Sequence, residues 1–263
     1  MCAIFGMAFQ KGHTICNSEM IEAILNKLSI ESMQKGRNAS GFAFVSDREI
    51  AVLKKDITSK ELISRAEYKE ALTKYLNFSS TKSSSGRPTF SVIGHCRMKT
   101  QGTERDNKNN HPIVREDVVG VHNGIISNDW SLFQQHEDQF KRNAAVDSEI
   151  IFALAEHYAN VSGSIIDALR DLYIKISGSY ACVMVHRLHP HIVWLFRNTS
   201  PCVIYHYENC GLTIWSTSQK FIETATEKYS LGTPTEIKFP INTAIALDMI
   251  QNKFHRFSLL GDA

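Results

Sequence analysis

The sequence lacks a long apolar run, an excess of charge of one sign and any closely spaced pair of cysteines. No apolar stretch approaches the roughly 20 residues that span a bilayer, which argues against a transmembrane helix. The formal net charge of +2 is close to neutral, so composition indicates neither a nucleic-acid partner nor a membrane surface. The first residues also lack the basic segment, the long apolar segment and the cleavage site of a signal peptide.

Cysteine and histidine spacing gives no indication of a metal site. The six cysteines form no C-x-x-C pair and no zinc-like pattern. Without an export signal, we expect them to be reduced thiols of a cytoplasmic protein. A histidine cluster, formed by His186, His189 and His191, has no carboxylate or cysteine arranged with it. We therefore predict a solvated turn at this cluster and no bound metal.

What is present is the composition of an ordinary globular protein, with 43% hydrophobic and 21% charged residues. Segments with helical and with strand periodicity occur in comparable amounts, and several strands are adjacent in sequence, which predicts a layered α+β domain with largely antiparallel sheets. The expected strands cover residues 4–9, 42–45, 90–94, 118–122, 180–186, 192–196, 202–207, 212–215, 235–239 and 243–247. The expected helices begin at a cap formed by Asn17 or Ser18 and further on cover residues 60–76, 130–136, 148–158 and 164–174. The polar stretch 79–86 is interpreted as a surface loop, not as a domain linker.

Cys2 follows directly after the initiator methionine. Its small side chain allows removal of Met1, which would leave a thiol and a free α-amine on the same residue. An unperturbed α-amino group has a pKa of about 7.7–8.0, so it can act as general base near neutral pH, directly or through one water. A cysteine at position 2 is by itself more often incidental, so this assignment depends on the rest of the sequence.

Three further segments accompany Cys2. The first is G-H-C-R-M-K-T-Q-G at residues 94–102, followed by N-H-P at 110–112. The second is V-H-N-G-I-I-S-N at 121–128, and the third is V-D-S-E-I-I at 146–151. In order and spacing these segments resemble the class II (N-terminal nucleophile) glutamine amidotransferases, and above all the glutaminase domain of glucosamine-6-phosphate synthase. Looser matches to that family occur at 35–41, 199–201 and 215–218. One such motif is a weak signal, but the set in the family's order is specific.

The resemblance implies that Cys2 is the nucleophile and attacks the side-chain amide of glutamine. The oxyanion that forms needs hydrogen-bond donors already in place. The side-chain NH₂ of Asn123 and the backbone N–H of Gly124 would supply them, and glycine lets the backbone approach closely. Loss of one such donor typically lowers the rate about 100- to 1,000-fold.

The resemblance also assigns the residues that hold the rest of glutamine. The planar fork of Arg97 suits the α-carboxylate, to which Thr100 would add a hydroxyl donor, and Asp147 suits the α-ammonium as its charge partner. Taken singly, these residues have simpler explanations. Arg97 would be a surface ion-pair residue, Asn123-Gly124 a hairpin turn, and Asp147 a helix N-cap.

Four positions depart from the family's pattern. Met98 stands at the usual tryptophan, and Gln101 at the usual histidine. Lys35 stands at the arginine of the family's R-G-x-D-S turn, unless Arg37 takes its place, and Asn38 stands at its aspartate. These positions shape and cover the glutamine pocket in the family, so the tightness of binding and the choice of γ-amide substrate stay open.

The resemblance implies the four-layer αββα sandwich of N-terminal nucleophile hydrolases, as a single domain over residues 1–263 with a mature start at Cys2. It implies hydrolysis of L-glutamine to L-glutamate and ammonia, without a cofactor or a metal. Because the sequence ends where sugar-isomerase domains would begin, we expect no such domain here and a separate synthase subunit as ammonia acceptor. Two alternatives stay open: a stand-alone γ-glutamyl amide hydrolase acting on a larger metabolite, and a catalytically silent binding subunit.

Overall fold

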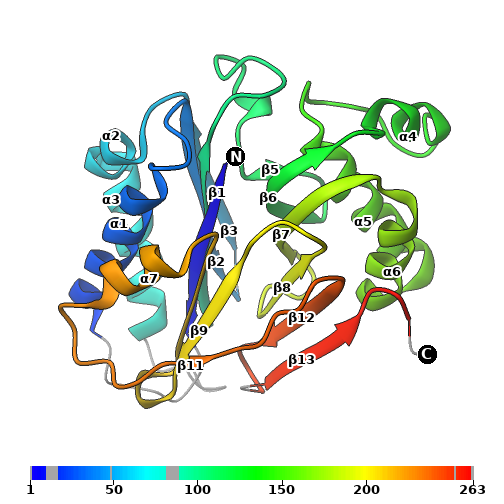
Figure 1. Cartoon of the computed structure of the whole chain (residues 1–263). Coiled ribbons are helices and arrows are strands. Elements are labelled where there is room, and N and C mark those ends of the chain that lie inside the picture. The colour runs from blue at the N-terminus through cyan, green and yellow to red at the C-terminus, as the bar shows by residue number, and fades with distance from the viewer. Residues whose placement is uncertain (1, 10–16, 48, 81–88, 252, 262–263) are drawn as a thin grey trace.

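The computed structural model describes residues 2–9, 17–47, 49–80, 89–251 and 253–261, and within them the strands form two antiparallel sheets (Figure 1). The first sheet has the strand order β11-β9-β10-β1-β4-β2-β3 and the second has the order β13-β12-β8-β7-β6-β5. The strands of the first sheet are β1 (Ala3–Phe9), β2 (Ala39–Ser46), β3 (Ile50–Lys55), β4 (Phe90–Arg97), β9 (Val203–Tyr207), β10 (Leu212–Ser216) and β11 (Thr235–Glu236). Those of the second are β5 (Ile113–Val114), β6 (Val118–Ile126), β7 (Gly178–His186), β8 (Ile192–Arg197), β12 (Thr243–Asp248) and β13 (Lys253–Ser258).

Helices cover the outer face of each sheet, and the two inner faces pack on each other (Figure 1). The first sheet carries α1 (Ser18–Ser32), α2 (Ser59–Ser64), α3 (Ala66–Ser80) and α7 (Gln219–Thr226). The second carries α4 (Asp129–Gln135), α5 (Ser148–Ser162) and α6 (Ile165–Lys175). The expected four-layer αββα sandwich is therefore confirmed.

Alternation along the strands divides the core into layers. In β1, Ala3, Phe5 and Met7 face the helices of the first sheet, whereas Ile4 and Ala8 face the second sheet. Successive side chains of a strand point to opposite faces, so one strand serves two separate cores. The layer between the sheets is filled mainly by valine, isoleucine and alanine from both sides.

Several observed elements differ from those expected. The helix expected at 60–76 is interrupted at Arg65, whose extended backbone (φ −75°, ψ 148°) separates α2 from α3. The strand expected at 118–122 continues to Ile126, so the hairpin turn considered for Asn123-Gly124 is wrong. The strand expected at 235–239 is only Thr235–Glu236.

Strands β3, β5 and β13 and helix α7 were not expected. Every residue of β3 is only partly buried, and β13 is largely exposed at a sheet edge, so neither carries a clear apolar alternation. The cap expected at the start of α1 is confirmed, because the Asn17 side chain accepts a hydrogen bond from the Met20 N–H at 2.8 Å. Of the loop expected at 79–86, residues 79–80 belong to α3 and the remainder lies outside the described residues.

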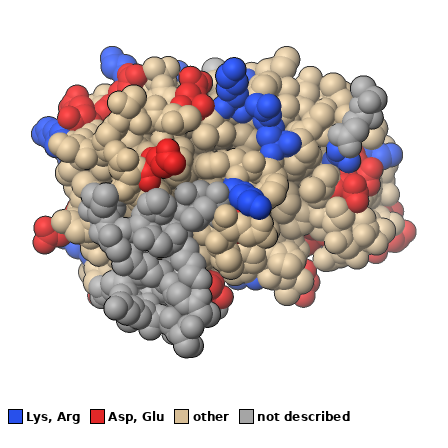
Figure 2. Space-filling view, turned by 90° about the horizontal axis from the view of Figure 1, so that it is seen from below, with Lys and Arg blue, Asp and Glu red and all other residues tan. Residues whose placement is uncertain are grey.

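The molecular surface shown in Figure 2 carries both signs of charge. On this face a short row of basic side chains near the middle is flanked by acidic side chains on both sides, and neither sign covers the face continuously. Among the described residues, no helix is both long enough and apolar enough to cross a membrane.

Candidate active site

Three neighbouring strands bring the predicted residues to one place, between the two sheets. Strand β4 pairs with β1 in the first sheet, with Cys96 opposite Ala3, and both strands pack against β6 of the second sheet. Alternation turns Ile4 and Ile93 into the layer between the sheets, and it does the same for Val121. Cys2 lies two residues before Ile4, His95 two residues after Ile93, and Asn123 two residues after Val121. By the same alternation, all three face the layer between the sheets. In Figure 1 the N-terminal end of β1 lies in the first sheet, on the side that faces β6 of the second sheet.

The Cys2 thiol is held by the backbone that follows β4. Its Sγ lies 3.3 Å from the Met98 N and 3.4 Å from the Met98 O. Burial raises the pKa of the Cys2 thiol, while the hydrogen bond with Met98 and the positive charge of Arg97 oppose that rise. Such a thiol is mainly protonated near neutral pH, so it needs a base to become a nucleophile.

The start of β1 is fixed from the other side by Thr217. The Thr217 hydroxyl accepts a hydrogen bond from the Ile4 N–H at 3.0 Å, and the Thr217 N–H donates to the Ile4 carbonyl at 3.0 Å. Thr217 is buried, as is Ser216, which pairs with Phe5 across β10 and β1. The backbone next to Cys2 is therefore bound on both sides.

Arg97 is the last residue of β4 and is buried, with an exposed fraction of only 3%. One terminal nitrogen, Nη1, donates to the Asn110 Oδ1 at 2.8 Å. The other, Nη2, donates to the carbonyl oxygens of Gln101 and Gly102. No salt bridge joins Arg97 to any described residue, so the surface ion pair considered from the sequence is not observed.

The Asn123 side chain is fully buried, yet neither its Oδ1 nor its Nδ2 has a hydrogen-bond partner among the described residues. A buried amide without a partner costs free energy and is rare in folded proteins. The next residue, Gly124, has a φ of 151°, and a Cβ at this position would collide with the Ser179 carbonyl oxygen. Glycine is therefore required here, in the middle of a paired strand.

Asp147 precedes α5 but does not cap it with its side chain. Instead its Oδ2 accepts a hydrogen bond from the Ile126 N–H at 2.7 Å, which ties it to β6. The helix N-cap considered from the sequence is therefore wrong for this side chain. Burial is the main cause of the pKa shifts of Cys2 and Arg97, and the negative charge of Asp147 makes a smaller contribution to each.

Comparison with known proteins finds relatives over the part of the chain that contains these site residues. The model of the glutamine amidotransferase domain family matches residues 95–223, a range that includes Arg97, Asn123, Gly124 and Asp147. The glutamine–fructose-6-phosphate aminotransferase (isomerizing) of Chlamydia pneumoniae is 29% identical over 207 residues, which cover 78% of this chain and 30% of that protein. Together these matches support a class II glutamine amidotransferase domain. The resemblance stated from the motifs is thus confirmed.

Further relatives agree with this assignment. The glutamine–fructose-6-phosphate aminotransferase (isomerizing) of Helicobacter pylori (strain J99) is 27% identical over 205 residues, again covering 78% of this chain and 30% of that protein. The chain thus spans about 30% of the length of the curated relatives that it matches.

Solved structures show the fold of this amidotransferase independently. The glutamine phosphoribosylpyrophosphate (PRPP) amidotransferase from B. subtilis, complexed with ADP and GMP, superposes with a TM-score of 0.69 at 14% identity, covering 98% of this chain and 49% of that chain. A structure described as the allosteric regulatory enzyme of purine biosynthesis gives a TM-score of 0.68 at 15% identity, with the same coverage. At these identities the likeness concerns the N-terminal nucleophile fold alone.

Sequence reasoning missed a group of buried histidines in this amidotransferase. The rings of His95 and His111 stack at 4.1 Å between centroids, and the His95 Nε2 lies 3.1 Å from the His122 carbonyl oxygen, so the group bridges the two sheets. Burial lowers the pKa of His95 to about 3, and it also lowers the pKa values of His111 and His122. The available signal was alternation, because His95 and Arg97 share the inward face of β4 with Ile93.

The turn before β2 also shapes the amidotransferase site. A Cβ on Gly36 would collide with the Arg97 backbone, so this turn packs directly on the end of β4. Asn38, which departs from the family's aspartate, accepts a hydrogen bond from the Lys99 N–H at 3.0 Å through its Oδ1. Thr100 is exposed in the segment that follows β4. It makes no hydrogen bond with any described residue, so no such contact links it to the other predicted site residues.

The three histidines considered as metal ligands lie near one another, with ring centroids 6.1 Å apart for His186 and His189 and 6.2 Å apart for His189 and His191. Among the described residues, no group of three or more His, Cys, Asp or Glu side chains is placed to hold a metal ion. His186 ends β7, and His189 and His191 lie in the connection to β8. No disulfide joins the cysteines in the described part of the chain, which are Cys2, Cys96, Cys182, Cys202 and Cys210.

Proposed function

We propose that this domain hydrolyses L-glutamine to L-glutamate and ammonia through a γ-glutamyl thioester on Cys2. The observation that carries the proposal is the unpartnered amide of Asn123, which is fully buried and shares its layer with Cys2 and Arg97. A polar group kept buried without a partner fits a site where charge appears only during reaction. The buried carboxylate of Asp147, whose negative charge acts on the same thiol, supports a bound α-ammonium.

The chemistry would proceed in two stages. After removal of Met1, the α-amine of Cys2 takes the thiol proton, directly or through one water, and the sulfur attacks the Cδ carbonyl of glutamine. The Asn123 NH₂ and the Gly124 N–H donate to the oxyanion, and the departing amide takes the proton and leaves as ammonia. Water then attacks the thioester, which releases glutamate and returns the proton to the thiolate.

The proposed grip on glutamine uses three residues. Arg97 and Thr100 would hold the α-carboxylate, and Asp147 would pair with the α-ammonium. The exposed position of Thr100 means that the segment 98–102 would have to move for its hydroxyl to reach the carboxylate.

The ammonia acceptor and the extent of the domain are part of the same proposal. The two sheets share one apolar layer, which supports residues 1–263 as a single amidotransferase domain. We propose that a synthase, as a separate subunit, receives the ammonia. Co-elution of the purified domain with such a subunit, with glutaminase activity rising on complex formation, would support this, and unchanged elution in its presence would contradict it.

The decisive experiment is intact-mass analysis after incubation with a glutamine-like diazoketone. We expect loss of Met1 and a single adduct that maps to Cys2. Cys2→Ala should lose both the adduct and ammonia release, whereas Cys210→Ala, near the far end of β10, should keep both. Retention of Met1, or an adduct on another cysteine, would contradict the mechanism. The absence of labelling and of ammonia release in the presence of the synthase would favour a silent binding subunit.

One observation supports a second candidate, a stand-alone hydrolase of larger γ-glutamyl amides. Met98 replaces the family's tryptophan, contacts the thiol through its backbone and is 44% exposed. A smaller side chain there leaves more room beside Cys2 for a bulky amine group. Steady-state kinetics on a panel of γ-glutamyl amides separates the two, since a wide preference for free glutamine removes this candidate.

A further inference from the structure

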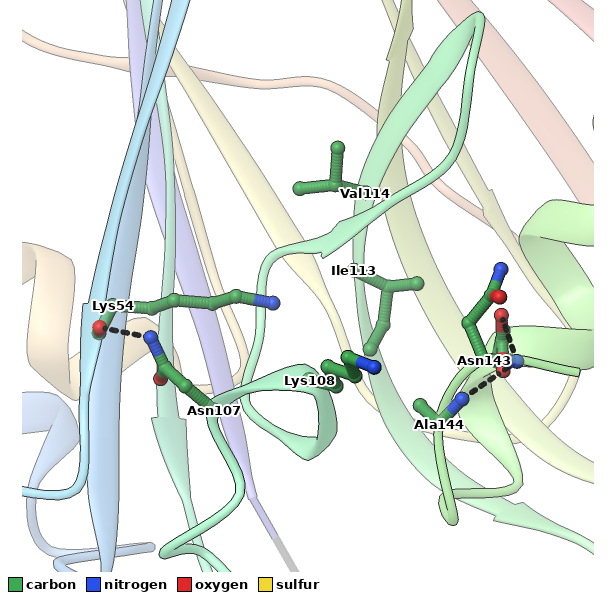
Figure 3. A pocket seen from close by; sticks show the side chains of 8 residues that line it. Lys54, Asn107, Lys108, Ile113, Val114, Asn143 and Ala144 are labelled. Carbon is green, nitrogen blue, oxygen red and sulfur yellow. Dashed lines mark hydrogen bonds between the residues drawn. The ribbon is translucent and has the colours of Figure 1, made fainter.

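A pocket outside the proposed glutamine site lies against the loop 107–114, whose Asn110 side chain binds Arg97. Its volume is about 410 Å³, and it is enclosed by β3, the loop 107–114 and the segment before α5 (Figure 3). None of its lining side chains takes part in the proposed glutamine chemistry. The lining residues are Lys54, Asn107, Lys108, Ile113, Val114, Asn143, Ala144 and Glu149.

The ammonium of Lys54 is the most unusual group in this pocket. It donates to the carbonyl oxygens of Asn110 at 2.7 Å and of Pro112 at 2.9 Å, and no carboxylate of the described residues lies within ion-pair distance of it. Burial lowers the pKa of Lys54 to about 8, and the more distant charges of Asp106 and Glu149 offset only part of this effect. A partly desolvated ammonium without a counter-ion favours an anion beside it.

The carboxylate in the lining does not cancel this preference. Glu149 accepts hydrogen bonds from the Asn143 N–H and the Ala144 N–H and is paired with Arg115 at 3.0 Å. Its charge is therefore partly offset within the protein, because it shares Arg115 with Glu156, which lies 3.2 Å from the same guanidinium. Because the lining holds two lysines, Lys54 and the exposed Lys108, and one carboxylate, its net charge is positive.

The remaining lining adds polar donors and an apolar wall. The Asn143 side-chain amide makes no hydrogen bond with a described residue, so its NH₂ can donate to a ligand. Ile113 and Val114 supply apolar surface on one side (Figure 3). A cavity of this size and lining suits a small metabolite that carries one acidic group on a short carbon skeleton.

We propose that this pocket binds a small anion bearing a carboxylate or phosphate group, held by Lys54. The site is also connected to the proposed glutamine site, a link that rests on the proposed function. Lys54 holds the main chain of Asn110, and the Asn110 side chain holds Arg97 at 2.8 Å. An anion that takes a hydrogen bond from Lys54 therefore changes the support of Arg97, and with it the affinity for glutamine.

Binding is tested with inorganic phosphate and, in a parallel arm, with succinate, by calorimetry at constant ionic strength. We expect saturable binding of at least one probe to the wild-type chain, about 10- to 100-fold weaker in Lys54→Met, which keeps the length of the side chain. Lys220→Met, at an exposed lysine of α7, is the matched control and should bind like wild type. Equal affinity in Lys54→Met and wild type, or no saturable binding of either probe, overturns the site.

Two further measurements keep the test decisive. Lys108→Ala changes only an exposed side chain at the rim and should weaken binding about two- to fivefold even if Lys54→Met folds poorly. Affinity should fall as pH rises through about 8, where Lys54 loses its charge. The other charged groups around the pocket are Asp106, Glu149, Lys108 and Arg115. An affinity that stays constant over this range contradicts the role of Lys54.

The link to the glutamine site has a separate readout. The bound probe should change the KM for glutamine in the wild type and leave it unchanged in Lys54→Met. Binding without any change in KM refutes the link but keeps the anion site. If the chain proves to have no glutaminase activity, the calorimetric result still decides the site.

Discussion

At the scale of single residues, the site combines side chains that are bound firmly with one that is not bound at all. Arg97 makes hydrogen bonds with three partners and Asp147 holds the backbone of β6, whereas the amide of Asn123 has no partner in the part of the chain that the structure describes. Hydrogen bonds within the protein therefore hold Arg97 and Asp147, which are assigned to the charges of glutamine, and leave the Asn123 amide available as a donor. This division is what an oxyanion site requires, because its donor must be free until the transition state forms.

Asn123 and Asn110 make a matched pair of variants. Asn123→Ala should lower kcat about 100- to 1,000-fold with little change in melting temperature, because the lost amide makes no hydrogen bond in the folded protein. Asn110→Ala should instead raise KM and lower the melting temperature, since its side chain binds Arg97, Glu104 and Asn107. Glutaminase kinetics with thermal unfolding checks both, and a stable Asn123→Ala enzyme with normal kcat would exclude the oxyanion role.

The sequence predicted the identity of the site residues better than their contacts. Strand alternation turns Arg97 and Asn123 toward the layer between the sheets, beside the start of β1, whereas the catalytic roles of Cys2 and Asp147 stay a prediction from the family motifs. The sequence did not predict that the Arg97 guanidinium would donate hydrogen bonds to the carbonyls of Gln101 and Gly102. Nor did it predict that the Asp147 carboxylate would accept a hydrogen bond from the Ile126 N–H and leave α5 uncapped. Such contacts depend on loop conformation, which no residue pattern specifies.

At the scale of elements, the position of Cys2 is set by β1 and by what holds its first residues. The strand is paired with β4 and β10, and Thr217 adds side-chain and backbone hydrogen bonds to Ile4 just beyond the end of β10. Central strands were predictable from apolar runs. Edge strands such as β3 and β13 were not, because partial exposure removes the alternation on which the prediction depends.

The contact between Thr217 and Ile4 can be tested with an isosteric change. Thr217→Val keeps the shape of the side chain but leaves the buried Ile4 N–H without its acceptor, which should cost about 1–3 kcal/mol of the free energy of unfolding. Loss of this support should also lower kcat, because Ile4 lies two residues from Cys2. Urea unfolding and glutaminase kinetics measure the two effects. Thr233→Val, at an exposed threonine, is the control, and equal stability of the two variants would contradict the argument.

At the scale of the whole molecule, the two sheets meet through polar as well as apolar contacts. The apolar layer was predictable as a class of architecture from the mixture of helices and adjacent strands. The histidines that cross it were not, since a histidine in an apolar run reads from the sequence as an ordinary interruption. Their burial makes the union of the two sheets sensitive to protonation.

The pH dependence of stability should reflect this burial. His95 has a folded-state pKa of about 3 against 6.5 when unfolded, so its neutral form is fully favourable above about pH 6.5 and its contribution is lost as pH falls toward 3. At about pH 5 the expected loss is about 2 kcal/mol for this residue. Urea unfolding at about pH 7.5 and 5 should show a smaller loss in His95→Asn than in wild type. His255→Asn, at an exposed histidine, should not differ from wild type, and identical pH profiles for all three would refute the assignment.

The hydrogen bonds of Arg97 have one more consequence. A guanidinium offers its five N–H groups as a rigid fork, and both of the two-pronged sides that can grip a carboxylate include Nη2. That nitrogen already donates both of its hydrogens to the carbonyls of Gln101 and Gly102. Under the proposed role of Arg97, the main chain is thus a resident competitor of the α-carboxylate of glutamine, and binding would begin with an exchange of one for the other.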